Sequence, residues 1–309
     1  LRILLDWLLR TASRGRLFLI QTWQAREQAV VINVRLPRVA AAALVGAALS
    51  TAGCSYQGMF RNPMVSPDLL GASTGAGFGA ALGLLFGLGY GAITGLSFGF
   101  GLLAVLLAYL ISRVSKIQTT LAMVLAGVMI SSLFTSGTSF IKLVADPTDQ
   151  LPAITYWLMG SLTSIKARDV QFAVLPILVG LIPLWLLRWR VNLLTVSEAE
   201  ARSMGVDTTR LRVVVVLCAT LMTAGSVAIS GMIGWVGLVI PHFGRMIFGQ
   251  DYRRLLPASS LLGATFLMVV DNLARTITTS EIPLGILTSF VGAPVFLYLI
   301  LSGGTQRGD

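Results

Sequence analysis

Few residues in this sequence could carry chemistry, and most of them lie at the ends of long apolar stretches. His242 is the only histidine, and it follows Pro241 directly. A metal site needs several ligands at suitable spacing, which a lone imidazole lacks, whereas the backbone carbonyl that a helical proline frees gives it a structural partner. Cys54 and Cys218 lie far apart inside apolar segments, where cysteine acts as a small hydrophobic side chain. We therefore expect no metal, cofactor or catalytic site in this chain.

One acidic residue, Asp271, lies near the interior of an apolar stretch, and Arg275 follows it one helical turn later. Residues four apart lie on the same face of a helix, so this spacing predicts an ion pair. Charged groups inside a membrane helix are costly and either serve a function or anchor a helix end. The remaining acids lie in loops or close to the ends of apolar stretches.

The polar segment 193–208 has the pattern of a self-contained helix between two apolar stretches. Ser197 and Glu200 stand three residues apart, as in a capping box, and Gly205 suits the left-handed turn that ends a helix. Asp207 is placed to cap the helix that follows. A short rigid helix here could transmit force from a soluble partner, although it could also be a plain connector.

The composition indicates that most of the chain lies in lipid. Of the 309 residues, 55% are hydrophobic and 12% are charged, and the mean hydropathy is +0.82. An apolar stretch of about 20 residues crosses the hydrocarbon layer as a helix, and small residues let such helices pack closely. The net charge of +10 comes from single basic residues at the ends of apolar stretches, with no basic run, which argues against nucleic-acid binding.

The sequence predicts an all-α, polytopic helical membrane protein. Residues 146–168 are too polar to cross, and we expect a loop there with a short surface helix around Tyr156 and Trp157. Charged residues interrupt the apolar runs of residues 1–30, which we interpret as an atypical amino-terminal segment before a permease domain at 31–309. The nine expected crossings are 37–58, 69–88, 92–112, 119–143, 170–188, 211–230, 232–248, 255–275 and 283–302.

The basic residues also predict the orientation, because loops rich in Lys and Arg favour the cytoplasm. One set of alternate loops carries twelve: Arg61, Arg113, Lys116, Arg188, Arg190, Arg202, Arg210, Arg212, Arg245, Arg253, Arg254 and Arg307. The other set carries six: Arg35, Arg38, Lys142, Lys166, Arg168 and Arg275. The first set is therefore expected on the cytoplasmic side, together with the carboxyl terminus.

A series of short motifs follows in order over residues 33–302. They are Arg35-Leu36-Pro37-Arg38, Gln57-Gly58-Met59-Phe60-Arg61-Asn62-Pro63-Met64, Pro67-Asp68-Leu69-Leu70-Gly71, Tyr156-Trp157-Leu158-Met159-Gly160-Ser161, Ala201-Arg202-Ser203-Met204-Gly205, Gly234-Trp235-Val236-Gly237-Leu238-Val239-Ile240-Pro241-His242, Asp271-Asn272-Leu273-Ala274-Arg275, Pro283-Leu284-Gly285-Ile286-Leu287-Thr288 and Gly292-Ala293-Pro294-Val295-Phe296. Together they resemble the FecCD-type permease family, which imports iron-siderophores, haem and cobalamin. The amino terminus departs from the family, which has a clear first span there and ten helices in all.

The resemblance implies the type II ABC importer permease fold of the vitamin B12 importer. It implies a homodimer in the bacterial or archaeal plasma (inner) membrane, with two ATP-hydrolysing subunits on the cytoplasmic side and an external substrate-binding protein. The chain lacks a Gly-x-x-x-x-Gly-Lys-Ser/Thr phosphate loop, so ATP and Mg²⁺ are expected on the partner ATPase and no enzymatic activity is expected here.

The resemblance also assigns roles to particular residues. Three arginines, Arg35, Arg38 and Arg275, would face carboxylates of the binding protein, with snorkelling to the membrane surface as the alternative. The cytoplasmic gate would lie at Asn62, Met64, Thr119 and Thr120, although turn chemistry alone explains Asn-Pro. Contact with the ATPase would involve Ser197, Glu198, Glu200, Ala201, Arg202, Ser203, Met204 and Gly205.

The substrate is open among ferric siderophores, haem, cobalamin and oxyanions such as molybdate, all of which members of the family carry. A secondary carrier driven by protons or sodium is the alternative function. Such carriers usually place ion-coordinating groups near the bilayer midplane, and apart from Asp271 the acids here lie in loops or at span ends. A passive channel or structural subunit would not need the capped helix at 197–204.

Overall fold

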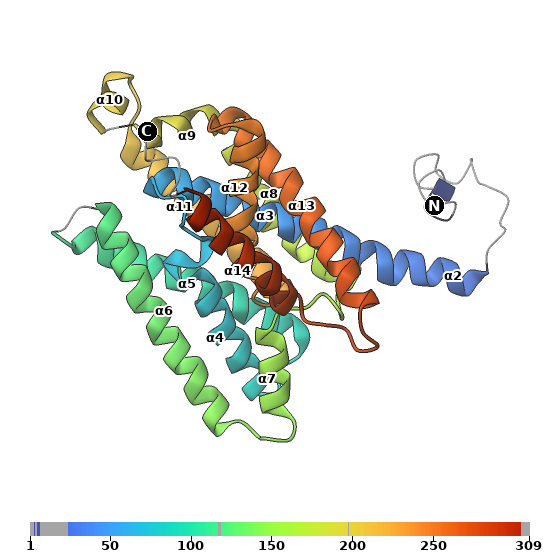
Figure 1. The fold of residues 1–309 in the computed structure, drawn as a ribbon. Helices are drawn as coiled ribbons and strands as arrows, with labels where there is room; N and C mark the ends of the chain where they lie inside the picture. The colour runs from blue at the N-terminus through green and yellow to red at the C-terminus, as the bar shows by residue number, and fades with distance from the viewer. Residues whose placement is uncertain (1–2, 4, 7–23, 117–118, 197, 304–309) are drawn as a thin grey trace.

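The computed structural model describes residues 3, 5–6, 24–116, 119–196 and 198–303. In this part of the chain the regular structure is entirely helical, as predicted (Figure 1). The elements are α2 (Ala25–Val30), η1 (Val31–Arg35), α3 (Leu36–Phe60), η2 (Pro67–Leu70), α4 (Ala72–Leu85), α5 (Tyr90–Val114), α6 (Thr119–Val144), α7 (Gln150–Leu158), α8 (Ala167–Leu186), α9 (Arg188–Thr195), α10 (Glu198–Ser203), α11 (Thr208–Ser230), α12 (Val236–Phe248), α13 (Tyr252–Thr276) and α14 (Leu284–Gly303).

The helices long and apolar enough to cross a membrane agree with the predicted crossings. Among the described residues, six helices reach spanning length, and three shorter apolar helices, Ala72–Leu85, Val236–Phe248 and Leu284–Tyr298, occupy the remaining predicted positions. The short helix expected around Tyr156 and Trp157 is α7. Chain segments of this length and hydropathy satisfy their backbone groups internally, which lipid requires.

Among the described residues, the first helix long enough to cross a membrane begins earlier than the sequence predicted. It runs without a break from Ala25 to Phe60, and the π-helical turn η1 lies immediately before Pro37. A proline ring lacks an N–H and displaces the carbonyl four residues earlier, so a wider turn at this point lets the helix continue. The polar residues of α2 therefore extend the helix outward from the bundle, as Figure 1 shows.

Helices α3 and α11 form the centre of the bundle. Helix α3 packs against α11, α12 and α13, while α11 also contacts α5 and α8. In the spanning window of α11, 78% of the residues are buried, against 33% in α6 and α8, which border the bundle. The outward side chains of α6 are mostly apolar, as contact with lipid requires.

Small residues let the central helices touch through their backbones. A Cβ atom on Gly53 of α3 would lie 1.8 Å from the carbonyl oxygen of Gly237, and one on Gly46 would lie 2.2 Å from that of Gly263. Between these contacts, the Ser50 hydroxyl donates to the Ser259 carbonyl oxygen at 2.8 Å. Close backbone approach with interhelical hydrogen bonds is the usual way in which helices associate in lipid.

Candidate functional site

The predicted helix of the 193–208 segment is present as α10, at the end of the bundle that also carries α9 (Figure 1). Gly205 adopts a left-handed φ of +76°, and the Met204 and Val206 amides donate to the carbonyls of Glu200 and Ala201 at 3.2 Å each. The Asp207 carboxylate accepts from the Arg210 amide at 3.1 Å, which caps α11 as expected. Ser197 lies outside the described residues, so its capping box stays a prediction.

The residues of α10 differ in how accessible they are. Ala201 is fully buried, which anchors the helix, whereas Glu200, Ser203 and Met204 are exposed. The side chains of Glu198 and Arg202 fall outside the described part of the chain. The described surface of α10 is therefore open to a partner, with one small residue holding it in place.

Helix α9 and Val196, which lead into α10, are hydrogen-bonded to residues at the ends of α3 and α13. The Arg61 guanidinium donates from Nε to the Leu194 carbonyl at 2.9 Å and also bonds the Val196 carbonyl. The Asn192 side chain donates to Asp251 at 2.8 Å and accepts from the Tyr252 amide at 2.9 Å. Displacement of the segment that leads into α10 would thus also displace the ends of α3 and α13.

The predicted gate residues lie on two separate segments. Asn62 accepts from the Met64 amide at 2.9 Å, so its side chain makes the turn that the Asn-Pro sequence suggested. Met64 is half exposed, while Gln57 holds the loop by donating to the Val65 carbonyl at 3.1 Å. Thr119 and Thr120 begin α6, and the side chain of Thr119 lies outside the described part. Their assignment to a gate stays a prediction.

Four charged side chains form an ionic cluster at the end of the bundle opposite α10. We call Arg38, Asp271, Arg275 and Glu281 the outer cluster. Arg38 bonds Asp271 through Nε at 2.8 Å and Glu281 through a terminal nitrogen at 2.8 and 2.9 Å. Arg275 pairs with Asp271 at 3.3 Å, as its spacing predicted. The cluster ties α3 to α13 and to the loop before α14.

Arg38, the third residue of the predicted docking patch, is buried within the outer cluster. Its side chain is only 7% exposed and both of its carboxylate partners belong to this chain, so it does not present a free charge to a second protein. The physical reason is the side chain of Asp271, which is 1% exposed, because a buried carboxylate is costly unless a cation lies close to it. In this structure Arg38 therefore pairs within its own chain, and its part in docking stays a prediction.

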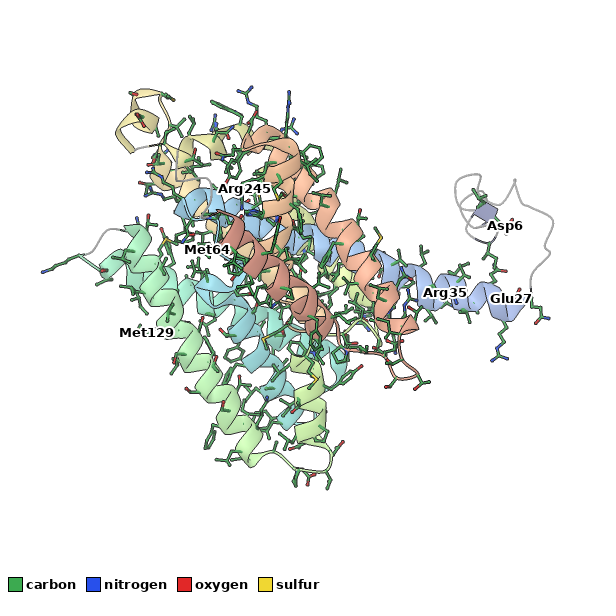
Figure 2. All side chains as sticks on the ribbon, in the orientation of Figure 1. Asp6, Glu27, Arg35, Met64, Met129 and Arg245 are labelled. Carbon is green, nitrogen blue, oxygen red and sulfur yellow. The ribbon has the colours of Figure 1, made fainter. Side chains whose placement is uncertain are left out.

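Arg35 and Arg275 are brought together at the surface. They line a groove of about 670 Å³ with Asn272, between the start of the first long helix and the end of α13. Arg35 is exposed on the part of the helix that projects from the bundle (Figure 2), and Arg275 is partly exposed. The two guanidinium groups can thus meet the same external surface.

Sequence reasoning missed Glu281, Arg61 and Asn192 as structural connectors. Glu281 looked like an ordinary loop acid, yet it accepts from Arg38 and from the Thr163 hydroxyl at 2.7 Å. Arg61 entered the prediction of orientation and one family motif without a structural role, although it closes α3 in a left-handed conformation with φ of 51°. The sequence shows only that these three residues lie near the ends of predicted crossings. That position does not reveal a bonding partner far away in the sequence.

Comparison with known proteins agrees with this architecture. Residues 9–302 match the FecCD transport family. The chain is 41% identical to the molybdate import system permease protein MolB of Haemophilus influenzae over 91% of this chain and 84% of that protein. It is 37% identical to the cobalamin import system permease protein BtuC of Halobacterium salinarum, over 88% and 73%. A solved structure described as an inward-facing metal-chelate type ABC transporter matches 97% of this chain and 98% of its own, with a TM-score of 0.86 and 38% identity.

Glu281 makes the outer cluster sensitive to acid. Burial raises its pKa, but hydrogen bonds from Thr163 and Arg38 and the charges of Arg38 and Arg275 outweigh this, so the pKa lies below its ordinary value of 4.5. A lowered folded-state pKa stabilises the fold above the ordinary value, and this stabilisation is lost as pH falls through the folded-state pKa. Glu281→Gln should cost roughly 1 to 2 kcal/mol at neutral pH, because a partly exposed charged hydrogen bond is lost.

Thermal unfolding of the purified permease over a pH series measures this effect. The wild type should lose stability on acidification more steeply than Glu281→Gln, and the two should converge at low pH. Asp149→Asn is the control, since Asp149 is an exposed acid whose side chain makes no capping bond. Parallel pH profiles for the wild type and Glu281→Gln would contradict the role given to Glu281.

Proposed function

The chain belongs to the FecCD transport family. From this premise we propose which partner of an importer binds at each of the two faces of the bundle. It is the membrane permease of an ATP-binding-cassette importer, as its relatives are. Such permeases work with an ATPase and an external binding protein. The proposal concerns where each partner docks and how the force reaches the membrane helices.

The observation that carries the proposal is the position of α10. The exposed side of this helix, with Glu200, Ser203 and Met204, docks in a groove of the ATPase, and Ser197, Glu198 and Arg202 join the contact. ATP and Mg²⁺ bind to the ATPase, while this subunit needs no cofactor of its own. The hydrogen bonds of α9 support this role, because Arg61 and Asn192 connect the segment before α10 to α3 and α13. Motion of the ATPase is thereby passed to helices that cross the membrane.

On the opposite face, Arg35 and Arg275 receive the binding protein. Both line one groove, and guanidinium groups pair well with carboxylates through two hydrogen bonds. Arg38 contributes indirectly, since its bonds to Asp271 and Glu281 fix the end of α13 that carries Arg275. Snorkelling of Arg35 and Arg275 to the membrane surface is the alternative.

Two copies of the chain form the permease in the plasma (inner) membrane of a bacterium or archaeon, with the carboxyl terminus in the cytoplasm. The excess of arginine on the α10 face supports this orientation. The substrate passes between the copies, and the loop of Asn62 and Met64, together with Thr119 and Thr120, closes the path on the cytoplasmic side.

The proposed substrate is a metal chelate, a cofactor or an oxyanion. Relatives are named for molybdate and for cobalamin, so the same framework serves chemically different cargo. The external binding protein selects the substrate. Asp271 is bonded to Arg38 and Arg275, which gives it a structural role and leaves an ion-coupled carrier without its usual titratable group.

Uptake into proteoliposomes tests the importer against the carrier. With the partner ATPase and the binding protein present, we expect uptake of cargo that requires ATP hydrolysis. A proton or sodium gradient without the ATPase should drive no uptake. Uptake that follows the ion gradient alone would assign the chain to the carriers instead.

Gly205 provides a test of α10 as the coupling element. Its φ of +76° strains any β-branched residue by about 1 to 2 kcal/mol, while the space around it is open, so Gly205→Val should tilt α10 without disturbing the bundle. ATP-dependent uptake should fall severalfold at unchanged protein yield. Gly89→Val is the control, because Gly89 has an ordinary φ of −65° and equally open surroundings. Full uptake by Gly205→Val would remove α10 from the mechanism.

Charge reversal tests the docking groove. The double variant Arg35→Glu with Arg275→Glu should weaken association of the binding protein about tenfold or more at low salt, and the difference should shrink as salt screens the charges. Lys166→Glu with Arg168→Glu reverses two exposed charges of the same face outside the groove and should have less effect. A salt-independent loss of binding in the double variant would indicate misfolding rather than a lost charge contact.

A further inference from the structure

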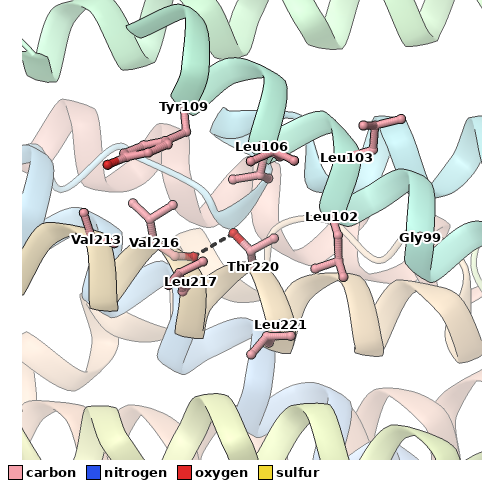
Figure 3. Close-up of a pocket in the computed structure, with 11 residues that line it drawn as sticks. Gly99, Leu102, Leu103, Leu106, Tyr109, Val213, Val216, Leu217, Thr220 and Leu221 are labelled. Carbon is pink, nitrogen blue, oxygen red and sulfur yellow. Dashed lines mark hydrogen bonds between the residues drawn. The ribbon is translucent and has the colours of Figure 1, made fainter. Parts of the chain in front are cut away.

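An apolar groove runs along the bundle between α5 and α11, away from the residues assigned to partners. Its volume is about 530 Å³ (Figure 3). The groove is lined by Gly99, Leu102, Leu103, Val105, Leu106, Tyr109, Val213, Val216, Leu217, Thr220 and Leu221. On the α11 side of the groove, the Thr220 hydroxyl donates to the Val216 carbonyl at 2.7 Å, so this hydroxyl does not need a partner in the groove. The groove therefore suits a hydrocarbon occupant.

The groove opens at one end into a polar pocket. Tyr109, Val213 and Val216 line both spaces, and the second space, of about 210 Å³, adds Ser112, Ser115, Met123 and Thr209 together with the basic residues Arg113 and Arg212. The Arg113 guanidinium lies 5.7 Å from the centre of the Tyr109 ring, which places its charge at the junction. A molecule that fills both spaces has a long apolar part and a compact anionic group.

The dimensions fit one leaflet of a membrane. Tyr109 comes ten positions after Gly99 on α5, which corresponds to about 15 Å at 1.5 Å per residue. The hydrocarbon core of a bilayer is about 30 Å thick, so the groove spans about half of it. In the proposed orientation, Arg113 and Arg212 lie at the cytoplasmic ends of α5 and α11, at the level of the inner-leaflet headgroups.

We propose that this groove and pocket bind one anionic phospholipid of the cytoplasmic leaflet. One acyl chain lies between α5 and α11, and the phosphate accepts charged hydrogen bonds from the two arginines. The inference rests on the proposed orientation but not on ATPase coupling or cargo. Because α11 follows directly after α10 and Asp207, the lipid contacts the helix that receives the force.

Lipid retention by the purified permease, measured by native mass spectrometry, tests the proposal. The probes are phosphatidylglycerol and phosphatidylcholine with identical acyl chains. The wild type should retain phosphatidylglycerol preferentially. Arg113→Gln with Arg212→Gln should lower this retention about fivefold for each arginine, the size of one basic contact with an anionic membrane. Retention of phosphatidylcholine should change little.

Two further variants separate the headgroup from the chain. A Cβ atom on Gly99 would meet no atom within 4 Å, and Gly99 lines the groove, so we expect Gly99→Phe to place its ring in the groove and lower retention of both lipids. Arg253→Gln with Arg254→Gln removes two exposed arginines from the same face, at the start of α13, and should leave retention unchanged. If the arginine variant fails to fold, Gly99→Phe still decides whether the groove holds a chain.

Several outcomes would overturn the proposal. Equal retention of the two lipids by the wild type would remove the headgroup site. Displacement of phosphatidylglycerol by inorganic phosphate at matched concentration would assign the pocket to a free anion. A change of oligomeric state in Gly99→Phe at unchanged lipid retention would assign the groove to a second copy of the chain. None of these readouts involves transport, so failure of the proposed importer function would be seen separately.

Discussion

The close backbone contact of α3 with α12 and α13 is the constraint on which the rest of the structure depends. Gly53 touches Gly237 and Gly46 approaches Gly263 with no room for a side chain between them. Lipid offers little hydrophobic driving force between helices, so such contacts must come from packing and hydrogen bonds. Once they are made, α3 is held along most of its length and becomes a rigid element between the two faces of the bundle.

Each end of this rigid helix carries an arginine that reaches a distant segment. At one end Arg38 bonds Asp271 of α13 and Glu281 of the following loop, and at the other Arg61 bonds the carbonyls of the segment before α10. The proposed coupling element and the proposed docking groove are thus attached to the same helix. A rigid connection of this kind can carry a change at one face to the other without a chain of flexible contacts.

Burial separates three arginines that look alike in the sequence. Arg38 lies among carboxylates that satisfy it, whereas Arg35 lies on a projecting helix and Arg275 divides its side chain between Asp271 and the surface groove. An ion pair removed from water is strongly destabilising when one partner is lost, while an exposed charge mainly steers association. The same residue type is therefore buried in an ion pair in one place and exposed at the surface in another.

The sequence by itself determined the helical membrane class, the nine apolar crossings, the surface helix at Tyr156, the short helix before Gly205 and the pairing of Asp271 with Arg275. These features follow from hydropathy, capping residues and spacing within one helix, which are local properties of the chain. The tertiary structure alone decided that Arg38 is buried, that Glu281 and Arg61 are connectors, and that α5 and α11 leave a groove between them. These features join residues that are far apart in sequence, as Arg38 and Glu281 are, and only the packing of the helices brings such residues into contact.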